Sequence, residues 1–200
     1  MDNEVKKFLK TKTIGRNIIF FDEIDSTQIQ AKKFAENCVT NGTIVLTENQ
    51  TGGLGTHGRK WYSEKNKNIA FTIILYPECE LQKLKNLTKD IAKCVVEALN
   101  RICKIKTDIK EPNDIMLNGK KMGGILTQII TKGENIRYLL IGIGINVNSK
   151  SFPLDLEKIA TSLKQQTKKE FCKEKIIAEF CNIFEEYCIR ENIIWIWKSR

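Results

Sequence analysis

The chain is poor in the residues that build metal clusters, disulfide frameworks and membrane spans. It has 3 prolines, 1 histidine and 7 cysteines without a Cys-x-x-Cys pair, which argues against a zinc site. No apolar run approaches the ~20 residues of a membrane span. None follows the charged N-terminus as in a signal peptide either. These absences predict a cytoplasmic protein whose cysteines are mostly small core residues.

The composition fits one folded domain with a solvated basic surface. The 200 residues carry a net charge of +9, and 42% of them are hydrophobic, which is enough for a core. The lysines are scattered and alternate with Glu and Asp, whereas a nucleic-acid footprint needs a stripe on one face. There is no internal repeat and no linker. We therefore expect a single domain over residues 1–200.

Two glycine-punctuated segments carry most of the functional information. Four glycines fall within 52–58 of the segment Gln50–Trp61, which excludes a helix or an ordinary strand interior. Such a loop exposes backbone N–H groups, and Arg59 and Lys60 add cationic donors behind it. The second segment, Lys110–Asp114, places a lysine, an amide and a carboxylate on a proline turn, and Gly119–Gly124 follows. Together they predict a site for an anionic ligand, a nucleotide with Mg²⁺.

Hydrophobic periodicity predicts alternating strands and helices. The expected strands cover 18–24, 43–48, 69–76, 104–110, 122–131 and 136–147, and Gly119 marks a hairpin. Asp25 is expected to cap a helix, with Gln28 at the capping-box spacing. That helix would bury Ala31, Phe34, Ala35 and Cys38. Two longer amphipathic helices are expected at about 84–102 and 173–190. The buried face of the second would carry Ile177, Phe180, Cys181, Phe184 and Cys188.

Residues 141–148 form a strand with two very different faces. Isoleucine and valine lie on one face, and glycine and asparagine on the other, because side chains alternate along a strand. The apolar face belongs in a core. The bare face, with Gly142, Gly144 and Asn146, suits either a flat ligand or a closely packed helix. This segment alone leaves both interpretations open.

Five motifs occur in the order and at the spacing found in biotin protein ligases, which the chain therefore resembles. They are Asp25-Ser26-Thr27-Gln28, the Gln50–Trp61 loop, Lys110-Glu111-Pro112-Asn113-Asp114, Lys121 with Gly123-Gly124, and Gly142-Ile143-Gly144-Ile145-Asn146. The resemblance covers about Ile18 to Ser199. It implies an α/β fold in which a mixed β-sheet has helices packed on one side, similar to class II aminoacyl-tRNA synthetases.

The resemblance also implies a reaction in two steps. Biotin and ATP give biotinyl-5′-AMP and pyrophosphate, and a lysine of a biotin carboxyl carrier domain then displaces AMP. Lys110 would bridge the biotin carboxylate and the α-phosphate, where charge builds during the displacement. Asn113 would contact the nucleotide, and Asp114 would ligate Mg²⁺. ATP and Mg²⁺ are thus the expected cofactors.

Two further sets of contacts follow from the same resemblance. The residues expected to bind biotin are Ser26, Thr27, Gln28, Gln50, Gly53, Leu54, Gly55, Thr56, Lys121, Gly124 and Gly144. The residues expected to bind ATP are Arg59, Lys60, Trp61, Asn113 and Asn146. Simpler interpretations stay open for some of them. Trp61 suits a core equally well, and Ser26 and Thr27 suit helix capping alone.

The glycine-rich loop departs from the family pattern. The family usually carries arginines where Leu54 and Thr56 stand, and a third basic residue near His57. An aromatic residue usually occupies the position of Glu111, whose carboxylate here either pairs with Lys110 or faces solvent. These departures leave the fold and the reaction class in place, but they predict a weaker hold on the adenylate.

The domain content also differs from that of many family members. About sixteen residues, 1–16, precede the first expected strand, too few for an N-terminal helix-turn-helix. The chain stops where the small C-terminal β-barrel of most members would begin. The apolar segment 193–197 is expected to form a final strand or to contact a partner, a homodimer being one such assembly.

Two other functions compete with a biotin ligase. One is a lipoate or octanoate ligase or transferase of the same fold. The other is a non-catalytic basic nucleic-acid-binding protein, which would bind DNA with a steep salt dependence. The motifs favour biotin, ATP and a carrier domain as partners, without DNA and without a membrane.

Overall fold

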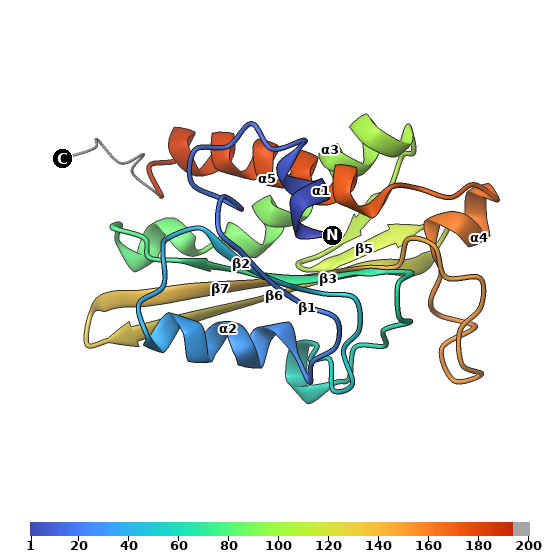
Figure 1. The fold of residues 1–200 in the computed structure, drawn as a ribbon, viewed down its shortest axis with the longest axis horizontal. Helices are drawn as coiled ribbons and strands as arrows, with labels where there is room; N and C mark the ends of the chain where they lie inside the picture. The colour runs from blue at the N-terminus through green and yellow to red at the C-terminus, as the bar shows by residue number, and fades with distance from the viewer. Residues whose placement is uncertain (194–200) are drawn as a thin grey trace.

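A seven-stranded mixed sheet forms the centre of the computed structural model, which describes residues 1–193 (Figure 1). The strands lie in the order β1-β2-β3-β7-β6-β5-β4. β1 and β2 are parallel, and all other neighbours are antiparallel. The strands are β1 (Ile18–Phe21), β2 (Thr43–Thr47), β3 (Ile69–Leu75), β4 (Asp108–Lys110), β5 (Asp114–Leu117), β6 (Lys120–Lys132) and β7 (Asn135–Ile145).

The two strands with the most continuous apolar sequence are buried along their whole length. Every residue of β2 and of β3 is buried. A strand covered on both faces needs apolar side chains at odd and even positions alike, which explains the absence of alternation in these two segments. The expected strands at 43–48 and 69–76 are confirmed to within one residue.

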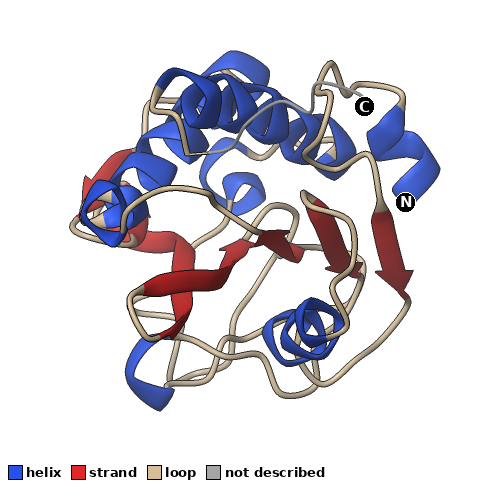
Figure 2. Cartoon of the chain, turned by 90° about the vertical axis from the view of Figure 1, so that its left-hand side faces the viewer, coloured by secondary structure: helices blue, strands red, loops and turns tan. Residues whose placement is uncertain are grey.

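Helices cover both faces of the sheet (Figures 1 and 2). They are α1 (Asp2–Lys6), α2 (Thr27–Glu36), α3 (Leu87–Cys103), α4 (Leu163–Thr167) and α5 (Lys173–Arg190), with short 3₁₀ turns η1 (Thr56–Gly58) and η2 (Leu81–Leu84). α3 and α5 lie together over the larger core, and α2 lies on the opposite face, where Ala31 and Ala35 pack with Val45 and Ile74. The mixed sheet with its helices confirms the predicted fold class, although α2 lies on the face opposite the two long helices.

The start and the end of α2 differ from the expectation. Ser26, and not Asp25, is the N-cap, and its Oγ accepts the backbone N–H of Gln28 at 3.3 Å. Asp25 lies one residue before the N-cap, and its carboxylate accepts the N–H of Ser26 at 2.7 Å and the side-chain amide of Gln30 at 3.1 Å. Phe34 is half-buried, and Cys38 is exposed because α2 has ended before it.

Short elements account for the other differences. The expected strand at 104–110 shrinks to β4, because Lys104 ends α3 in a left-handed conformation with a φ of 57°. The sequence analysis did not predict β5, which follows the proline turn and pairs with β6. Asn118 and Gly119 connect these strands with φ values of 49° and 76°, which confirms the hairpin. α1 and α4, with five residues each, are too short to leave a periodic signal.

The cysteines follow the expectation for a chain without a disulfide framework. All seven are free thiols, and Cys94, Cys103, Cys181 and Cys188 are buried. Burial raises the pKa of the Cys94 and Cys103 thiols to about 12. Within residues 1–193, the helices are all too short or too polar to cross a membrane.

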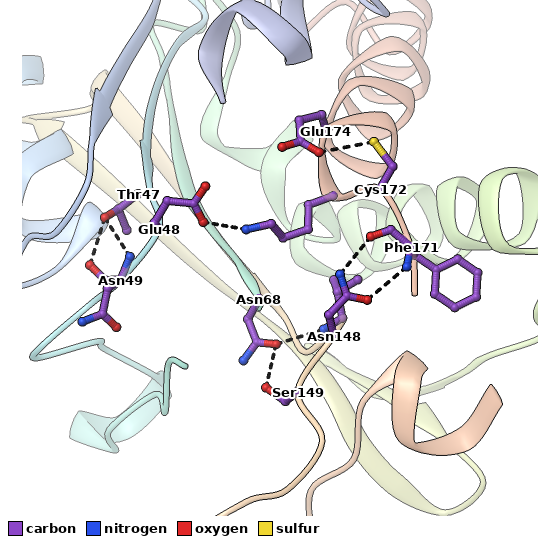
Figure 3. Close-up of polar contacts among 11 residues, drawn as sticks. Thr47, Glu48, Asn49, Asn68, Asn148, Ser149, Phe171, Cys172 and Glu174 are labelled. Carbon is purple, nitrogen blue, oxygen red and sulfur yellow. Dashed lines mark hydrogen bonds and ion pairs between the residues drawn. The ribbon is translucent and has the colours of Figure 1, made fainter. Parts of the chain in front are cut away.

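A polar network ties the ends of three strands to the start of α5 (Figure 3). Nζ of Lys173, at the first position of α5, lies 2.5 Å from Oε2 of Glu48, just after β2. Asn68, just before β3, accepts the backbone N–H of Val147 at 3.1 Å and the hydroxyl of Ser149 at 3.0 Å. The network therefore fixes where the long loops 48–68 and 146–172 leave the sheet.

We predict that Lys173→Met lowers the free energy of unfolding by about 3–5 kcal/mol, because it leaves the Glu48 carboxylate buried without a counter-charge. The two side chains are only 9% and 14% exposed. Chemical denaturation measures the change, and adding Glu48→Gln is expected to restore most of it. The exposed Lys65–Asp22 pair is the matched control, with side chains 46% and 69% exposed. Equal losses for Lys65→Met and Lys173→Met would contradict the role of burial.

Candidate functional site

One row of cross-strand partners runs over five strands of the sheet. Its members are Ala70 on β3, Gly144 on β7, Gly124 on β6, Asp114 on β5 and Lys110 on β4. Directly opposed residues project to the same face of a sheet, so the row begins bare and ends with two charged side chains. The row lies on the face of the sheet that α2 covers. Residues of β3 and β7 that are an even number of positions from the row point to the same face, and they pack against α2.

A small cavity of about 40 Å³ lies over the bare part of the row. Its polar lining comes from the start of α2, from the glycine-rich loop, and from Asn113 and Lys121. Oε1 of Gln50 accepts the backbone N–H of Thr27 at 2.9 Å and its hydroxyl at 3.1 Å. This cavity, called cavity 1 below, thus has a polar end in which several hydrogen-bonding directions are already fixed.

The indole of Trp61 lies over the glycines of the row. A Cβ atom on Gly144 would come within 2.4 Å of the ring, and one on Gly124 within 3.1 Å. Nζ of Lys121 lies 5.7 Å from the ring centroid, within the range of a cation–π contact. Trp61 lines cavity 1 and also the larger cavity beside it, so the ring separates the two. Its Nε1 is buried and finds no hydrogen-bond partner among the described residues.

The larger cavity, cavity 2, has a volume of about 450 Å³ and covers the charged end of the row. The cationic side chains in its lining are Arg59, Lys60, Lys110, Lys121 and Lys158. Asp114 supplies the single carboxylate among the described residues that line it. Such an excess of positive charge favours an anionic ligand.

Asp114 and Asn146 add oxygen atoms to this positive cavity. Oδ1 of Asp114 lies 2.6 Å from Nζ of Lys121, and both side chains are partly buried. The amide of Asn146 donates to the carbonyl of Thr161 at 3.1 Å, while its Oδ1 is buried without a partner in the described part of the chain. Over residues 1–193, His, Cys, Asp and Glu side chains nowhere gather in threes as a metal site would require. As a single carboxylate, Asp114 suits a cation whose other ligands come from a bound molecule or from water.

Most residues expected to form the site line one of the two cavities. Cavity 1 contains Ser26, Thr27, Gln28, Gln50, Leu54, Gly55, Thr56, Trp61, Asn113, Lys121, Gly124 and Gly144. Cavity 2 contains Gly55, Thr56, Arg59, Lys60, Trp61, Lys110, Asp114, Lys121 and Asn146. Residues from five segments of the chain are thus brought together.

A few residues lie elsewhere or have other partners. Gly53 lines neither cavity, because a Cβ there would come within 2.6 Å of the carbonyl of Trp61, and its role is close packing. Asn113 borders cavity 1 and not the cavity with the excess of cations. Glu111 pairs with Lys89 at 2.6 Å and not with Lys110. His57 is exposed at the tip of the loop.

Sequence reasoning missed several lining residues. In cavity 2 they are Tyr62, Met116, Phe152, Leu156, Lys158, Ile159 and Ala160. The segment 152–160 has neither a motif nor a periodicity, so nothing in the sequence points to it. Tyr62 and Phe152 meet edge to face with ring centroids 6.0 Å apart, which fixes this segment against the loop. One feature of the sequence could have pointed to Thr72, which lies behind cavity 1. Thr72 is the only polar residue in the apolar run of β3.

The biotin/lipoate A/B protein ligase family matches residues 20–146, which is more than half of the chain. The chain belongs to this family. Bifunctional ligase/repressor BirA of Bacillus spizizenii is 40% identical over 187 residues, which cover 92% of this chain and 58% of the relative. Biotin--[acetyl-CoA-carboxylase] ligase of Paracoccus denitrificans is 33% identical, covering 62% of this chain and 51% of the relative. This family member thus spans less than two thirds of either relative.

Solved structures agree with the family assignment. Biotin protein ligase from Aquifex aeolicus, in complex with biotin and ATP, has a TM-score of 0.75 and 31% identity, covering 88% of this chain and 72% of that one. The ligase from Leishmania major, in complex with biotin, has a TM-score of 0.67 at 24% identity, covering 92% and 84%. The second comparison shows a shared fold.

Gly144→Ala is expected to displace the indole of Trp61 and to shift its emission to longer wavelength, because the new Cβ would lie 2.4 Å from the ring. Gly52→Ala is the matched control, since a Cβ there meets only the carbonyl of Asp25 at 3.5 Å. From the spectrum of each variant we subtract the spectrum of the same variant carrying Trp61→Phe. The difference is the emission of Trp61 alone, because the other tryptophans contribute to both spectra. An unchanged emission maximum in Gly144→Ala would contradict the placement of the ring.

Proposed function

We propose that this chain activates biotin with ATP as biotinyl-5′-AMP and transfers the biotinyl group to a lysine of a biotin carboxyl carrier domain. The row from Ala70 to Lys110 carries the proposal. It offers a floor of small residues, which the Trp61 indole covers in this structure, with hydrogen-bonding groups beside one end and cations at the other. Biotin has the same polarity, because a ureido ring and a carboxylate lie at opposite ends of the molecule.

The polar end of cavity 1 supports a ureido ligand. The bonds that Gln50 accepts from Thr27 turn its amide group so that the NH₂ is left to donate. Ser26 accepts from a backbone N–H, so its hydroxyl proton is left to donate as well. Thr27 directs its own proton to Gln50 and keeps a lone pair as an acceptor. A ureido carbonyl needs donors and its N–H groups need acceptors, whereas the dithiolane ring of lipoate needs neither.

The charged end supports attack of a carboxylate on a nucleotide. A biotin carboxylate oxygen attacks the α-phosphorus of ATP, the bond to the β-phosphate oxygen breaks, and pyrophosphate leaves. Lys110 stabilises the charge that builds on the carboxylate and the phosphate, and Arg59 and Lys60 hold the phosphates. The carrier lysine then attacks the carbonyl carbon of the anhydride, loses a proton and releases AMP. Asn146 offers its unpaired Oδ1 to the nucleotide.

Asp114 is the proposed protein ligand of Mg²⁺. Mg²⁺ binds through one or two carboxylates together with phosphate oxygens and waters, and one carboxylate among five cations fits that pattern. When bound, the ion would neutralise charge on the phosphates. We also propose a carboxylase carrier domain as the partner, a cytoplasmic location, no binding to DNA, and a homodimer as one assembly state. Residues 1–200 are proposed to be a single catalytic domain.

ATP–pyrophosphate exchange with biotin, lipoate and octanoate in parallel tests the proposed activity. Exchange is expected with biotin alone, because lipoate and octanoate leave the donors and acceptors of cavity 1 unpaired. Faster exchange with lipoate or octanoate would replace the proposal by the related acid ligase. No exchange with any acid, together with tight salt-dependent DNA binding, would favour the non-catalytic alternative.

Lys110→Ala is predicted to lower the rate of biotin-dependent exchange by about 10²–10³, as for other removed electrostatic donors. The melting temperature is expected to stay unchanged, because Lys110 is exposed on a short edge strand. Lys106→Ala is the matched control, since Lys106 is exposed just before the same strand and lines neither cavity. Near-normal exchange in Lys110→Ala would remove Lys110 from the mechanism.

Release of biotinyl-5′-AMP is predicted to slow in the double variant Leu54→Arg and Thr56→Arg. Arg59 is now held by its own loop, donating to Thr56 Oγ1 at 2.9 Å. Each added charge-assisted hydrogen bond contributes about 1.5–3 kcal/mol, or roughly tenfold or more in release rate. Adenylate dissociation and labelling of a bystander protein measure the effect. Thr51→Arg, exposed on the same loop and outside both cavities, controls for added charge. Equal retention in all three proteins would show that other groups close the loop.

A further inference from the structure

A continuous chain of side-chain hydrogen bonds lies behind cavity 1. Nε2 of Gln28 donates to Oε1 of Gln128 on β6 at 3.0 Å. The hydroxyl of Thr72 lies 3.1 Å from Oε1 of Gln28 and 2.9 Å from Oγ1 of Thr27. Thr27 in turn donates to Oε1 of Gln50 on the glycine-rich loop, at 3.1 Å. These five side chains, called the polar relay below, join β6, α2 and β3 to the loop.

Thr72 is the centre of the relay and is 0% exposed. A buried hydroxyl without a partner costs free energy, so its two possible acceptors, Thr27 and Gln28, explain how the sheet tolerates it. Valine would fit the same volume in an otherwise apolar strand. A hydroxyl at this position therefore has consequences for hydrogen bonding and not for packing.

Gly142 makes room for the relay. A Cβ atom on Gly142 would lie 2.6 Å from Oε1 of Gln28. Because Gln128 takes the NH₂ of the Gln28 amide, the oxygen of that amide faces Thr72. Two glycines of the same strand therefore make room for different side chains. Gly142 leaves space for Gln28, and Gly144 leaves space for Trp61.

The relay limits what Thr27 can offer to a ligand. Thr72 has one hydroxyl proton and two acceptors within reach, and the shorter distance is to Thr27. With that proton on Thr27 Oγ1, the proton of Thr27 itself is directed to Gln50. Thr27, which lines cavity 1, is then left with one lone pair and no proton to donate.

We propose that Thr72 is a positioning residue that makes Thr27 an acceptor for a ring N–H group, with Gln28 and Gln128 holding the relay in register. The proposal rests on the proposed function, since it names biotin as the ligand with the ring N–H. Thr72 acts through Thr27 and lies outside the lining of both cavities.

The experiment compares Thr72→Val, Thr72→Ser and the unaltered protein in biotin binding by calorimetry and in exchange kinetics. Thr72→Val, which keeps the shape and removes the proton, is expected to raise Kd and KM for biotin about tenfold. kcat and the KM for ATP are expected to change by less than about twofold, because the charged end is untouched. Thr72→Ser, which restores the hydroxyl, is expected to bind biotin within about threefold of the unaltered protein.

Thr127→Val is the matched control for loss of a hydroxyl. Thr127 pairs with Thr88 at 3.0 Å on the other face of the sheet, so its loss is expected to leave the KM for biotin unchanged. Gln128→Met tests the relay at an exposed position where folding is not at risk, and a rise in Kd of about threefold is expected.

An unchanged Kd for biotin in both Thr72→Val and Gln128→Met would overturn the relay. So would an equal rise in the KM for biotin and for ATP without rescue by Thr72→Ser. Failure of the unaltered protein to bind biotin is a separate result, and it would overturn the proposed function itself.

Discussion

A one-residue slip in the pairing of β7 with β3 and β6 would turn Ile143 toward α2 and Gly144 into the core. The cross-strand register is therefore the constraint on which the site depends. It aligns Gly144 with Gly124 and continues through Asp114 to Lys110. The register is held by the isoleucines on the opposite face, which are buried under α3 and α5. The hydrophobic core thus specifies the geometry of a polar site on the other side of the sheet.

The bare face of β7 is filled by side chains that arrive from elsewhere in the chain. Trp61 comes from the glycine-rich loop and Gln28 from α2, and each occupies the space above one glycine. Of the two alternatives that the strand left open, a ligand surface and close packing, the structure shows close packing over both Gly142 and Gly144. Packing over Gly142 supports the polar end of cavity 1, and Trp61 divides that cavity from the one with the cations.

Loop anchoring and charge distribution complete the site. The Glu48–Lys173 pair and the contacts of Asn68 hold the ends of two long loops against the sheet (Figure 3). Those loops supply Arg59, Lys60 and Lys158 to one cavity. Cations gathered on long loops act together only when the loops begin and end at fixed points. The scattered lysines of the sequence become a local excess of charge in this way.

The local sequence determined the elements and most of the contacts that depend on short-range patterns. The continuous apolar runs of β2 and β3 and the 3.6-residue periodicity of α5 are local patterns, and the elements predicted from them are confirmed. The motifs also named most of the lining of cavity 1, but only about half of the lining of cavity 2. The short helices α1 and α4 escaped, because five residues make less than two helical turns and carry no measurable helical period. The four-residue strand β5 escaped as well.

Only the tertiary structure decided which partner each polar group finds. Glu111 pairs with Lys89 and not with its neighbour Lys110. The lining from segment 152–160 and the relay through Thr72 join residues that are many positions apart in the chain. Sequence patterns report periodicity and turn chemistry, which are local. Hydrogen-bond partners and cavity walls depend on long-range register and packing, which exist only once the sheet has formed.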